Sequence, residues 1–183
     1  DFNVITNFQR NYDTIHPMTE QELYDFLEQN NISYQRFEHP AVYTVAQANE
    51  HLMDAPGART KNLFICDGKK QHYYILWVQS NKKIHFNRLG KQQKLGKPRF
   101  GSPEKLQEYL GLTPGSVSLL ALVNDKQKRV SILIDKELWQ YDSFQCHPLI
   151  NTTTLVISRK DIQRFFEITG HDYQLIDIPA KVE

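Results

Sequence analysis

The stretch Gly57-Ala58-Arg59-Thr60-Lys61-Asn62-Leu63-Phe64-Ile65-Cys66 decides how we expect this chain to fold. Small and polar residues lead into an apolar run, and Asp67-Gly68 then marks a turn, which is the pattern of a loop that feeds a buried strand. Lys61 stands at or just inside the predicted start of that strand. An ammonium group beside core residues has to find an anion or lose its charge. Lys61 is therefore a candidate for binding or catalysis, with a lysine that snorkels to the surface as the alternative.

The composition around this stretch is that of a folded globular protein. The chain has 183 residues, of which 40% are apolar and 23% charged, and this length fits one domain with a sizeable core. No apolar run is long enough to span a bilayer, and the polar start, which lacks an initiator Met, is not a signal peptide. Cys66 and Cys146 lie far apart without metal-type spacing. We expect reduced cysteines in a cytoplasmic protein with no membrane partner.

Hydrophobic periodicity and turn signals predict a mixed, mostly antiparallel sheet flanked by helices, an α/β (α+β) fold. Residues 1–17 show no periodicity and are predicted to be a tail or lid, and residues 18–183 the domain. Predicted helices cover 19–30, 44–53, part of the basic region after Lys82, 103–110 and 158–170, with a helical turn at 135–139. Predicted strands cover 32–38, the stretch after Lys61, 72–78, 83–86, 129–134 as a partner of the apolar run 117–123, 152–157 and 173–178.

The charges are unevenly distributed although the net charge is only +1. The first 60 residues hold nine acids against three arginines, whereas the segment from Lys82 to Lys105 holds eight basic residues against Glu104. Such asymmetry indicates an anionic partner such as a nucleic-acid backbone, and a solvated helix face is the alternative.

Common catalytic signatures are absent from the sequence. It contains no G-x-S-x-G, P-loop or H-E-x-x-H pattern, and its seven histidines have no metal-ligand spacing, so we expect neither a metal nor a cofactor. Three loops remain, each next to a predicted strand or turn: Thr60-Lys61-Asn62, Pro114-Gly115-Ser116 and Cys146-His147-Pro148. We expect them to converge at one edge of the sheet, although a Pro-Gly turn or a single loop histidine also occurs for purely structural reasons.

Taken together, these segments resemble the YbaK-like family of aminoacyl-tRNA deacylases, which is related to the editing domain inserted in bacterial prolyl-tRNA synthetases. The resemblance is greatest to the free-standing PrdX (ProXp-ala) branch, which clears alanine from tRNA(Pro). It runs from about Thr19 to about Phe166. The matching segments are Phe37-Glu38-His39-Pro40 with Val42 and Thr44, Thr60-Lys61-Asn62-Leu63-Phe64, Gly115-Ser116-Val117-Ser118, Asn124-Asp125, and His147-Pro148-Leu149 with Asn151-Thr152.

The resemblance implies a role for each matched position. The catalytic positions fall on Lys61, Asn62, Gly115 and His147. Substrate contacts are implied at Thr44, Thr60, Ser116 and Pro148. This chain departs from the family pattern twice: Leu119 stands where the glycine loop usually ends in proline, and Cys146 where an aromatic residue often precedes the His-Pro pair.

The implied activity is hydrolysis of the ester in mischarged Ala-tRNA(Pro), without a metal. Such an ester is reactive, so positioning of water and stabilisation of the oxyanion suffice. Lys61 is available for the oxyanion or the terminal phosphate, backbone N–H groups around Gly115 for the carbonyl or the water, and Asn62 and His147 for the ribose hydroxyls or the α-amino group.

The partners expected are the acceptor end of tRNA(Pro) and, as an open alternative, prolyl-tRNA synthetase. Removal of cysteine or serine instead of alanine, a non-catalytic tRNA-binding or regulatory module, and an amino-acid- or nucleotide-binding protein without RNA also remain open. Phosphate contacts of the tRNA stem are our own inference from the charges and fall on Lys91, Lys94, Lys97 and Arg99.

Overall fold

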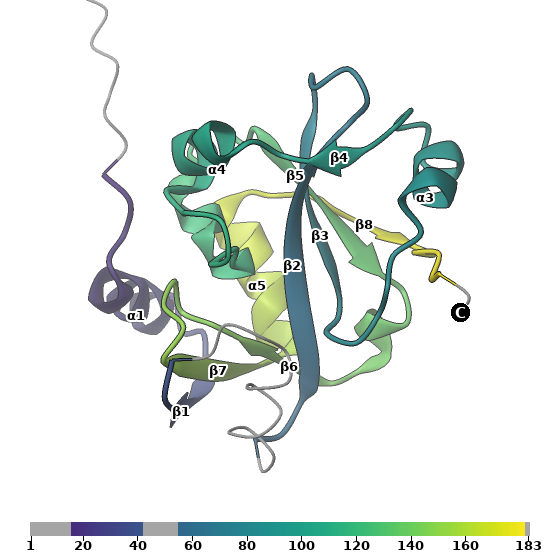
Figure 1. The fold of residues 1–183 in the computed structure, drawn as a ribbon. Helices are drawn as coiled ribbons and strands as arrows, with labels where there is room; N and C mark the ends of the chain where they lie inside the picture. Colours follow the sequence, from purple (N-terminus) through teal and green to yellow (C-terminus); the bar gives the residue numbers. More distant parts are fainter. Residues whose placement is uncertain (1–15, 42–54, 182–183) are drawn as a thin grey trace, which may run out of the picture.

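Strand β2 (Ala58–Cys66) runs through the middle of an eight-stranded mixed sheet (Figure 1). The structure, a computed structural model, describes residues 16–41 and 55–181. The strand order is β1-β7-β6-β2-β3-β5-β8, and β4 pairs with β2 outside this path. The other strands are β1 (Tyr34–Glu38), β3 (Tyr73–Gln79), β4 (Arg99–Phe100), β5 (Val130–Asp135), β6 (Ser143–Cys146), β7 (Thr153–Ser158) and β8 (Tyr173–Ile176).

The predicted hairpin of β2 with β3 is confirmed, and its register pairs Asn62 with Trp77. β1 with β7, β6 with β7 and β2 with β4 are also antiparallel. β2 with β6, β3 with β5 and β5 with β8 are parallel. The α/β class with a mixed sheet is therefore confirmed, and the parallel pairs bring together strands that lie far apart in the sequence.

The side chains of β2 alternate between two apolar layers because successive residues of a strand point to opposite faces. Phe64 and Cys66 belong to the larger cluster, which contains Trp77 and Phe144. Ile65 belongs to the smaller cluster, to which Leu63 packs from the rim. β2 therefore lies between the two clusters. Its even-numbered residues face the larger cluster, and its odd-numbered residues face the smaller one.

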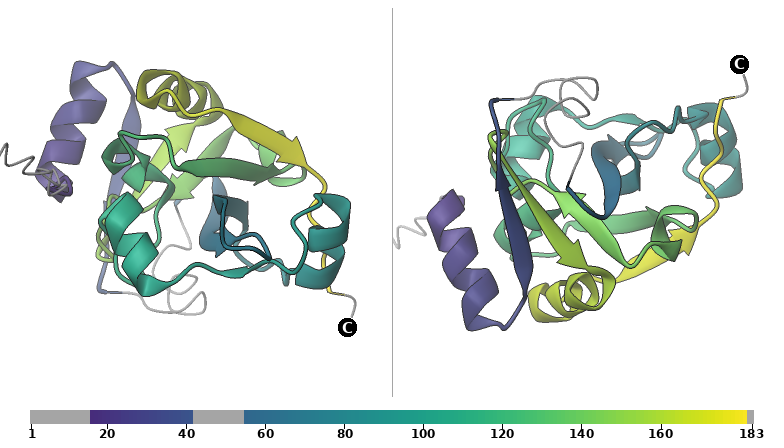
Figure 2. Two further views of the ribbon diagram at one scale, coloured as in Figure 1. Left: turned by 90° about the horizontal axis from the view of Figure 1, so that it is seen from above. Right: turned by 90° about the horizontal axis from the view of Figure 1, so that it is seen from below.

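The helices begin and end at the signals read from the sequence. Thr19 and Glu22 form a capping box, Pro103 follows the Ser102 cap, and Gly111 and Gly170 end their helices in the left-handed conformation. Figure 2 shows one helix beside β1 at one end of the molecule and a second near the carboxyl end. Among the described helices, none is long and apolar enough to cross a membrane. The bounds are α1 (Glu20–Gln29), α3 (Phe86–Gln92), α4 (Pro103–Leu110) and α5 (Arg159–Thr169), with 3₁₀ helices η1 (Leu119–Asn124) and η2 (Leu138–Gln140).

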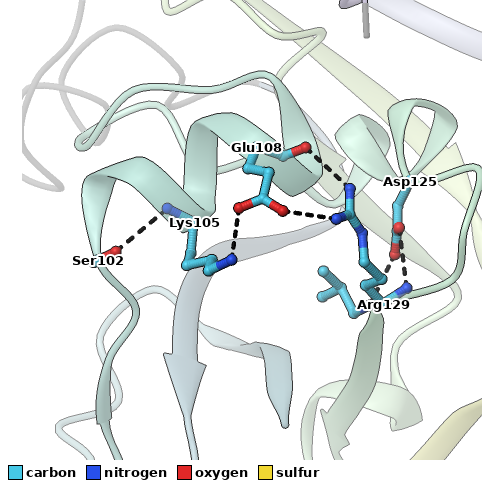
Figure 3. Close-up of polar contacts among 6 residues, drawn as sticks. Ser102, Lys105, Glu108, Asp125 and Arg129 are labelled. Atoms are coloured by element: carbon cyan, nitrogen blue, oxygen red, sulfur yellow. Dashed lines mark hydrogen bonds and ion pairs between the residues drawn. The ribbon is translucent and has the colours of Figure 1, made fainter. Parts of the chain in front are cut away.

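Helix α4 is tied to the turn before β5 by charged groups (Figure 3). Glu108 accepts hydrogen bonds from the side chains of Lys105 and Arg129, at 2.6 and 2.8 Å. The carboxylate of Asp125 accepts from the backbone N–H groups of Arg129 and Val130, at 3.0 and 2.8 Å. This network ties α4 to the turn that joins η1 to β5.

Several predicted elements differ in the structure. β2 begins at Ala58, so Lys61 lies inside the strand and not at its start. The run 117–123 contains no strand, and the 3₁₀ helix η1 occupies most of it, buried on every side; a continuous apolar run does not distinguish the two by periodicity. Residues 83–86 form only an isolated bridge, from Ile84 to Ala180. The short strands β4 and β6 were not predicted, and the predicted helix 44–53 and residues 1–15 lie outside the described residues.

Candidate functional site

One edge of β2 changes partner halfway along the strand, and this change creates the candidate site. β6 pairs with Ala58 and Arg59, and β4 pairs with Ile65 and Cys66. Between them, residues 61–63 have no partner strand on this edge among the described elements (Figure 1). The Phe64 carbonyl accepts from Gly101 on the same edge. Because backbone groups alternate between edges, the N–H and C=O of Asn62 also face this gap.

Thr60 and Asn62 share the face of β2 that carries Phe64 and Cys66. The Thr60 hydroxyl donates to the carbonyl of Gln145 at 2.7 Å, which joins β2 to the end of β6. Asn62 Oδ1 is buried and has no hydrogen-bond partner within residues 16–41 and 55–181. The buried indole N–H of its cross-strand neighbour Trp77 also has no partner there. Each such group costs roughly 1–3 kcal/mol in a closed core. A cluster of them therefore indicates a place where a polar ligand completes the bonding.

The glycine loop and the His-Pro loop, predicted to converge, are in direct contact. His147 Nε2 donates to the carbonyl of Val117 at 2.9 Å. In return the Ser118 hydroxyl donates to the carbonyl of His147 at 2.7 Å. Since His147 follows β6 directly and β6 is bonded to Thr60, all three predicted loops are linked by described contacts.

The imidazole of His147 is held as a neutral ring. Burial lowers its pKa, and the carbonyls of Val117 and Ile150 offset this effect only in part. With Nε2–H donating to Val117, Nδ1 is left as an acceptor, and it is buried with no partner in the described part of the chain. His147 Nδ1 and Asn62 Oδ1 are therefore two acceptors, on two of the linked loops, that are open to an N–H donor.

Lys61 is the predicted residue that the structure does not bring to this face. It lies between Thr60 and Asn62, so its side chain shares the opposite face of β2 with Leu63 and Ile65. Its ammonium donates to the carbonyl of Lys82 at 2.5 Å. Burial lowers the pKa of Lys61, so in this position the ammonium is a partly desolvated cation with a neutral partner.

The remaining predicted substrate contacts lie around the two loops. Gly115 is exposed with a φ of +91°, a conformation that glycine adopts without a steric penalty. The Ser116 hydroxyl donates to Thr113 at 2.8 Å, which closes the turn. Pro148 is buried, and Leu149 after it has a φ of +68°, a value rare outside glycine and concentrated at functional sites. Thr44 lies outside the described residues.

The two departures from the family pattern have clear structural consequences. Leu119 begins η1 fully buried, and the hydroxyl of Ser118 caps that helix at the N–H of Leu120, at 3.2 Å. The Ser118 cap therefore fixes the end of the glycine loop, at the position where the family pattern has a proline. Cys146 is buried in the core, and burial raises its pKa to about 12, so its thiol is not a nucleophile at neutral pH.

The four cations predicted to contact tRNA are exposed and near one another in the chain. Lys91 lies in the last turn of α3, Lys94 and Lys97 lie in the loop after it, and Arg99 begins β4. β4 joins β2 just beyond the unpaired residues 61–63. These cations therefore extend from the end of the β2 gap, away from β6.

Sequence reasoning missed two residues that organise the site. Ser118 was part of a matched segment, and its position before an apolar run is a cap signal. Gln145 gave no signal, because its contribution is a backbone carbonyl. In the described part of the chain no three His, Cys, Asp or Glu side chains are grouped to hold a metal ion.

Comparison with known proteins identifies the family of this sequence. The model of the aminoacyl-tRNA editing domain matches residues 39–165. The chain is 30% identical over 154 residues to the prolyl-tRNA editing protein ProX of Acetoanaerobium sticklandii, covering 83% of this chain and 93% of that protein. It is 34% identical over 155 residues to prolyl-tRNA synthetase associated domain-containing protein 1 of Danio rerio, covering 82% and 83%.

Solved structures support the fold. The crystal structure of hypothetical protein APE2540 superposes with a TM-score of 0.65 at 16% identity, over 85% of this chain and 97% of that chain. At this identity the likeness concerns the fold alone. The family match covers most of the chain and includes the β2 gap, the glycine loop and the His-Pro loop. This chain therefore belongs to the aminoacyl-tRNA editing domain family.

Proposed function

We propose that this protein hydrolyses the ester of alanine mischarged onto tRNA(Pro), in trans and without a metal. Water adds its hydroxyl to the acyl carbon, and the ribose oxygen leaves with the proton, so that alanine and free tRNA are released. The observation that carries the proposal is the pair of buried, unpartnered acceptors Asn62 Oδ1 and His147 Nδ1. An aminoacyl ester carries an α-ammonium group with three N–H donors, which satisfies both acceptors.

The carbonyl of the ester needs donors as its oxygen becomes negative. The N–H of Asn62 faces the β2 gap, and the loop at Gly115 offers further backbone N–H groups that a ligand approaches closely, since the glycine has no side chain. Preorganised donors of this kind lower the barrier by roughly 3–4 kcal/mol each. No strong nucleophile is required, in agreement with the raised pKa of Cys146.

Lys61 has a different part in this proposal. Its side chain lies on the face of β2 opposite Asn62, so we assign its ammonium to the terminal phosphate in preference to the oxyanion. A partly desolvated ammonium bonded only to a carbonyl gains a strong charge-assisted bond when a phosphate replaces that partner. Thr60, Ser116 and Pro148 shape the pocket around the amino acid.

The need for such an enzyme follows from binding energetics. A synthetase pocket built for proline rejects the smaller alanine weakly, because missing methylenes are worth only about 1–3 kcal/mol. A second site that admits alanine and excludes proline corrects the error. ProX is by its name a prolyl-tRNA editing protein, which favours tRNA(Pro) as the carrier here and the tRNA acceptor end as the partner.

The test is release of labelled amino acid from Ala-tRNA(Pro), with Cys-tRNA(Pro) and Ser-tRNA(Pro) alongside. We expect rapid loss of alanine with the wild type and at least tenfold slower loss with Asn62→Ala. Lys61→Met should raise KM more than it lowers kcat; the reverse result places the ammonium at the oxyanion. Ser131→Ala, on the exposed side of β5, is the matched control.

The outcome also separates the alternatives. Faster loss of cysteine or serine than of alanine changes the substrate and keeps the reaction. No hydrolysis of any charged tRNA, together with tight binding of tRNA, makes the protein a binding module. Absence of both activities leaves an amino-acid-binding or nucleotide-binding protein.

A further inference from the structure

Phe100 is the most exposed of the large apolar side chains in the described part of the chain, with 63% of its surface accessible. A single exposed apolar residue is ordinary. What sets Phe100 apart is the rigidity of its position and the charge of its surroundings.

The main chain around Phe100 is fixed by β2. Phe100 pairs with Ile65, and the next N–H, of Gly101, donates to the Phe64 carbonyl at 2.9 Å. A Cβ on Gly101 would lie 2.3 Å from the Phe64 ring, so glycine is required for this close approach. The ring of Phe100 also packs against Phe86, with centroids 5.5 Å apart. One aromatic face is therefore presented to solvent from a rigid support.

The surface around this ring is positively charged. From Gly68 to Pro103 the sequence contains no Asp or Glu. Both flanking cations are neutralised: Lys82 lies between Asp135 and Glu137, and Lys105 pairs with Glu108 (Figure 3). By contrast, no carboxylate within residues 16–41 and 55–181 forms an ion pair with the exposed cations Lys69, Lys70, Arg88, Lys91, Lys94, Lys97 and Arg99.

Backbone contacts gather these cations around β4. The N–H of Gly68, at the tip of the β2–β3 hairpin, donates to the Leu95 carbonyl at 2.7 Å. Arg99 donates to the Gly68 carbonyl at 3.4 Å. The hairpin lysines, the loop after α3 and β4 thus form one surface with Phe100 in it.

Phe100 also lies on the same side of the sheet as Lys61. Cross-strand partners point to the same face, so Phe100 shares the face of Ile65, and Lys61 lies on that face by parity. Lys61 is four residues from Ile65 along β2, roughly 13 Å at the strand rise of about 3.3 Å per residue. That distance spans about four stacked nucleotides.

We propose that Phe100 is a stacking platform for a base in the unpaired 3′ strand of the RNA substrate, with the surrounding cations holding its phosphates. The inference rests on the proposed function for the identity of the RNA. A protein partner fits this surface less well, because lysines are depleted at the centres of protein interfaces. Aromatic rings flanked by lysine and arginine are the usual means of holding single-stranded RNA.

The experiment measures equilibrium binding of an uncharged tRNA(Pro) transcript and of the same transcript without its single-stranded 3′ end, across a salt series. Phe100→Ala should weaken binding of the intact transcript by about 5- to 150-fold, the equivalent of 1–3 kcal/mol per stacked base. The slope of log K against log salt should not change, since no phosphate contact is lost. Binding of the truncated transcript should be unaffected.

Three variants make the result specific. Phe100→Tyr should bind like the wild type. Lys97→Ala should weaken both transcripts and reduce the salt slope by about 1. Leu175→Ala removes an exposed apolar side chain from β8 and should change nothing. Thermal denaturation checks that each variant is folded.

Equal affinity of Phe100→Ala and the wild type for the intact transcript overturns the proposal, as does an equal loss with the truncated one. A loss of affinity for prolyl-tRNA synthetase with tRNA binding unchanged makes the surface a protein-docking site and also overturns it. The proposed function is tested separately. If the protein hydrolyses no charged tRNA but Phe100→Ala still weakens tRNA binding as described, the proposed activity is wrong and the stacking platform stands.

Discussion

The Ser118 hydroxyl donates to the backbone carbonyl of His147 at 2.7 Å, while the His147 ring donates to the carbonyl of Val117 at 2.9 Å. These reciprocal bonds join two loops about 30 residues apart in the chain. The bond from Nε2 to Val117 leaves Nδ1 as an acceptor without a partner among the described residues. The relationship makes Ser118 a positioning residue for the site, although its side chain points at main chain and not at substrate.

Ser118→Ala should therefore affect stability and activity together. It removes the bond to His147 and the cap on Leu120, and we expect a loss of about 1–2 kcal/mol of unfolding free energy. With the two loops no longer joined at this point, kcat/KM for the charged tRNA should fall about tenfold. Denaturant titration and single-turnover hydrolysis measure the two effects. If Ser118→Ala is as active as the control Ser131→Ala, the remaining contacts position His147 without the Ser118 hydroxyl.

Lys82→Met should be among the most destabilising single changes. Its side chain and that of Asp135 are 8% and 1% exposed, and their ion pair measures 2.7 Å. Burial alone would lower the pKa of Lys82, but bonds to Asp135 and Glu137 outweigh it and raise the pKa. Loss of the lysine leaves a buried carboxylate without a counter-ion, at a cost of about 3–5 kcal/mol.

The neighbouring Lys136 supplies the control for this change. Its pair with Asp177 measures 2.8 Å, but the two side chains are 52% and 79% exposed. Lys136→Met should cost at most about 1 kcal/mol. Comparable costs for the two variants, read from denaturant midpoints, would show that the Lys82 pair is effectively solvated.

Acid stability should depend on Asp125. Burial alone would raise its pKa, but hydrogen bonds from His171 and from the N–H groups of Arg129 and Val130 outweigh burial and lower it. A carboxyl with a depressed folded pKa contributes fully above its unfolded value, here 3.8, and its contribution is lost as the pH falls below that value. Asp125→Asn should lower the free energy of unfolding near pH 7 by about 2–3 kcal/mol. It should also make that free energy fall less steeply as the pH is lowered.

Thermal unfolding followed between pH 2 and pH 7 measures this dependence. Asp142, whose side chain is 95% exposed, provides Asp142→Asn as the comparison, and its curve should follow the wild type. If Asp125→Asn loses stability at low pH as steeply as the wild type, other carboxyl groups cause the acid unfolding.

Both cysteines should resist thiol reagents in the folded protein. Cys66 and Cys146 are buried and free, burial raises the pKa of both, and that of Cys146 reaches about 12. A colorimetric thiol assay should find neither group reacting rapidly in native buffer and both reacting in guanidinium. Deacylation should continue after prolonged treatment with iodoacetamide. Rapid inactivation would show that Cys146 reaches solvent and the reacting ester.

The sequence identified what depends on local signals. Helix caps at Thr19, Ser102 and Gly170 and the β2–β3 hairpin follow from neighbouring residues, and all agree with the structure. The contact between the glycine loop and the His-Pro loop was also predicted correctly. The face on which the Lys61 side chain lies was not predicted. It follows only once β2 is known to begin at Ala58, and that start depends on pairing with β6, in which Ala58 lies opposite Phe144.

The pairing of β1 with β7 has a consequence for how the chain matures as it is made. More than a hundred residues separate these strands, so β1 waits without its partner until the segment beyond Thr153 has left the ribosome. The β6–β7 contact waits equally long, whereas the Ser118–His147 link needs only the chain up to residue 147. We therefore expect nascent chains that end before β7 to expose α1 and β1 to chaperones.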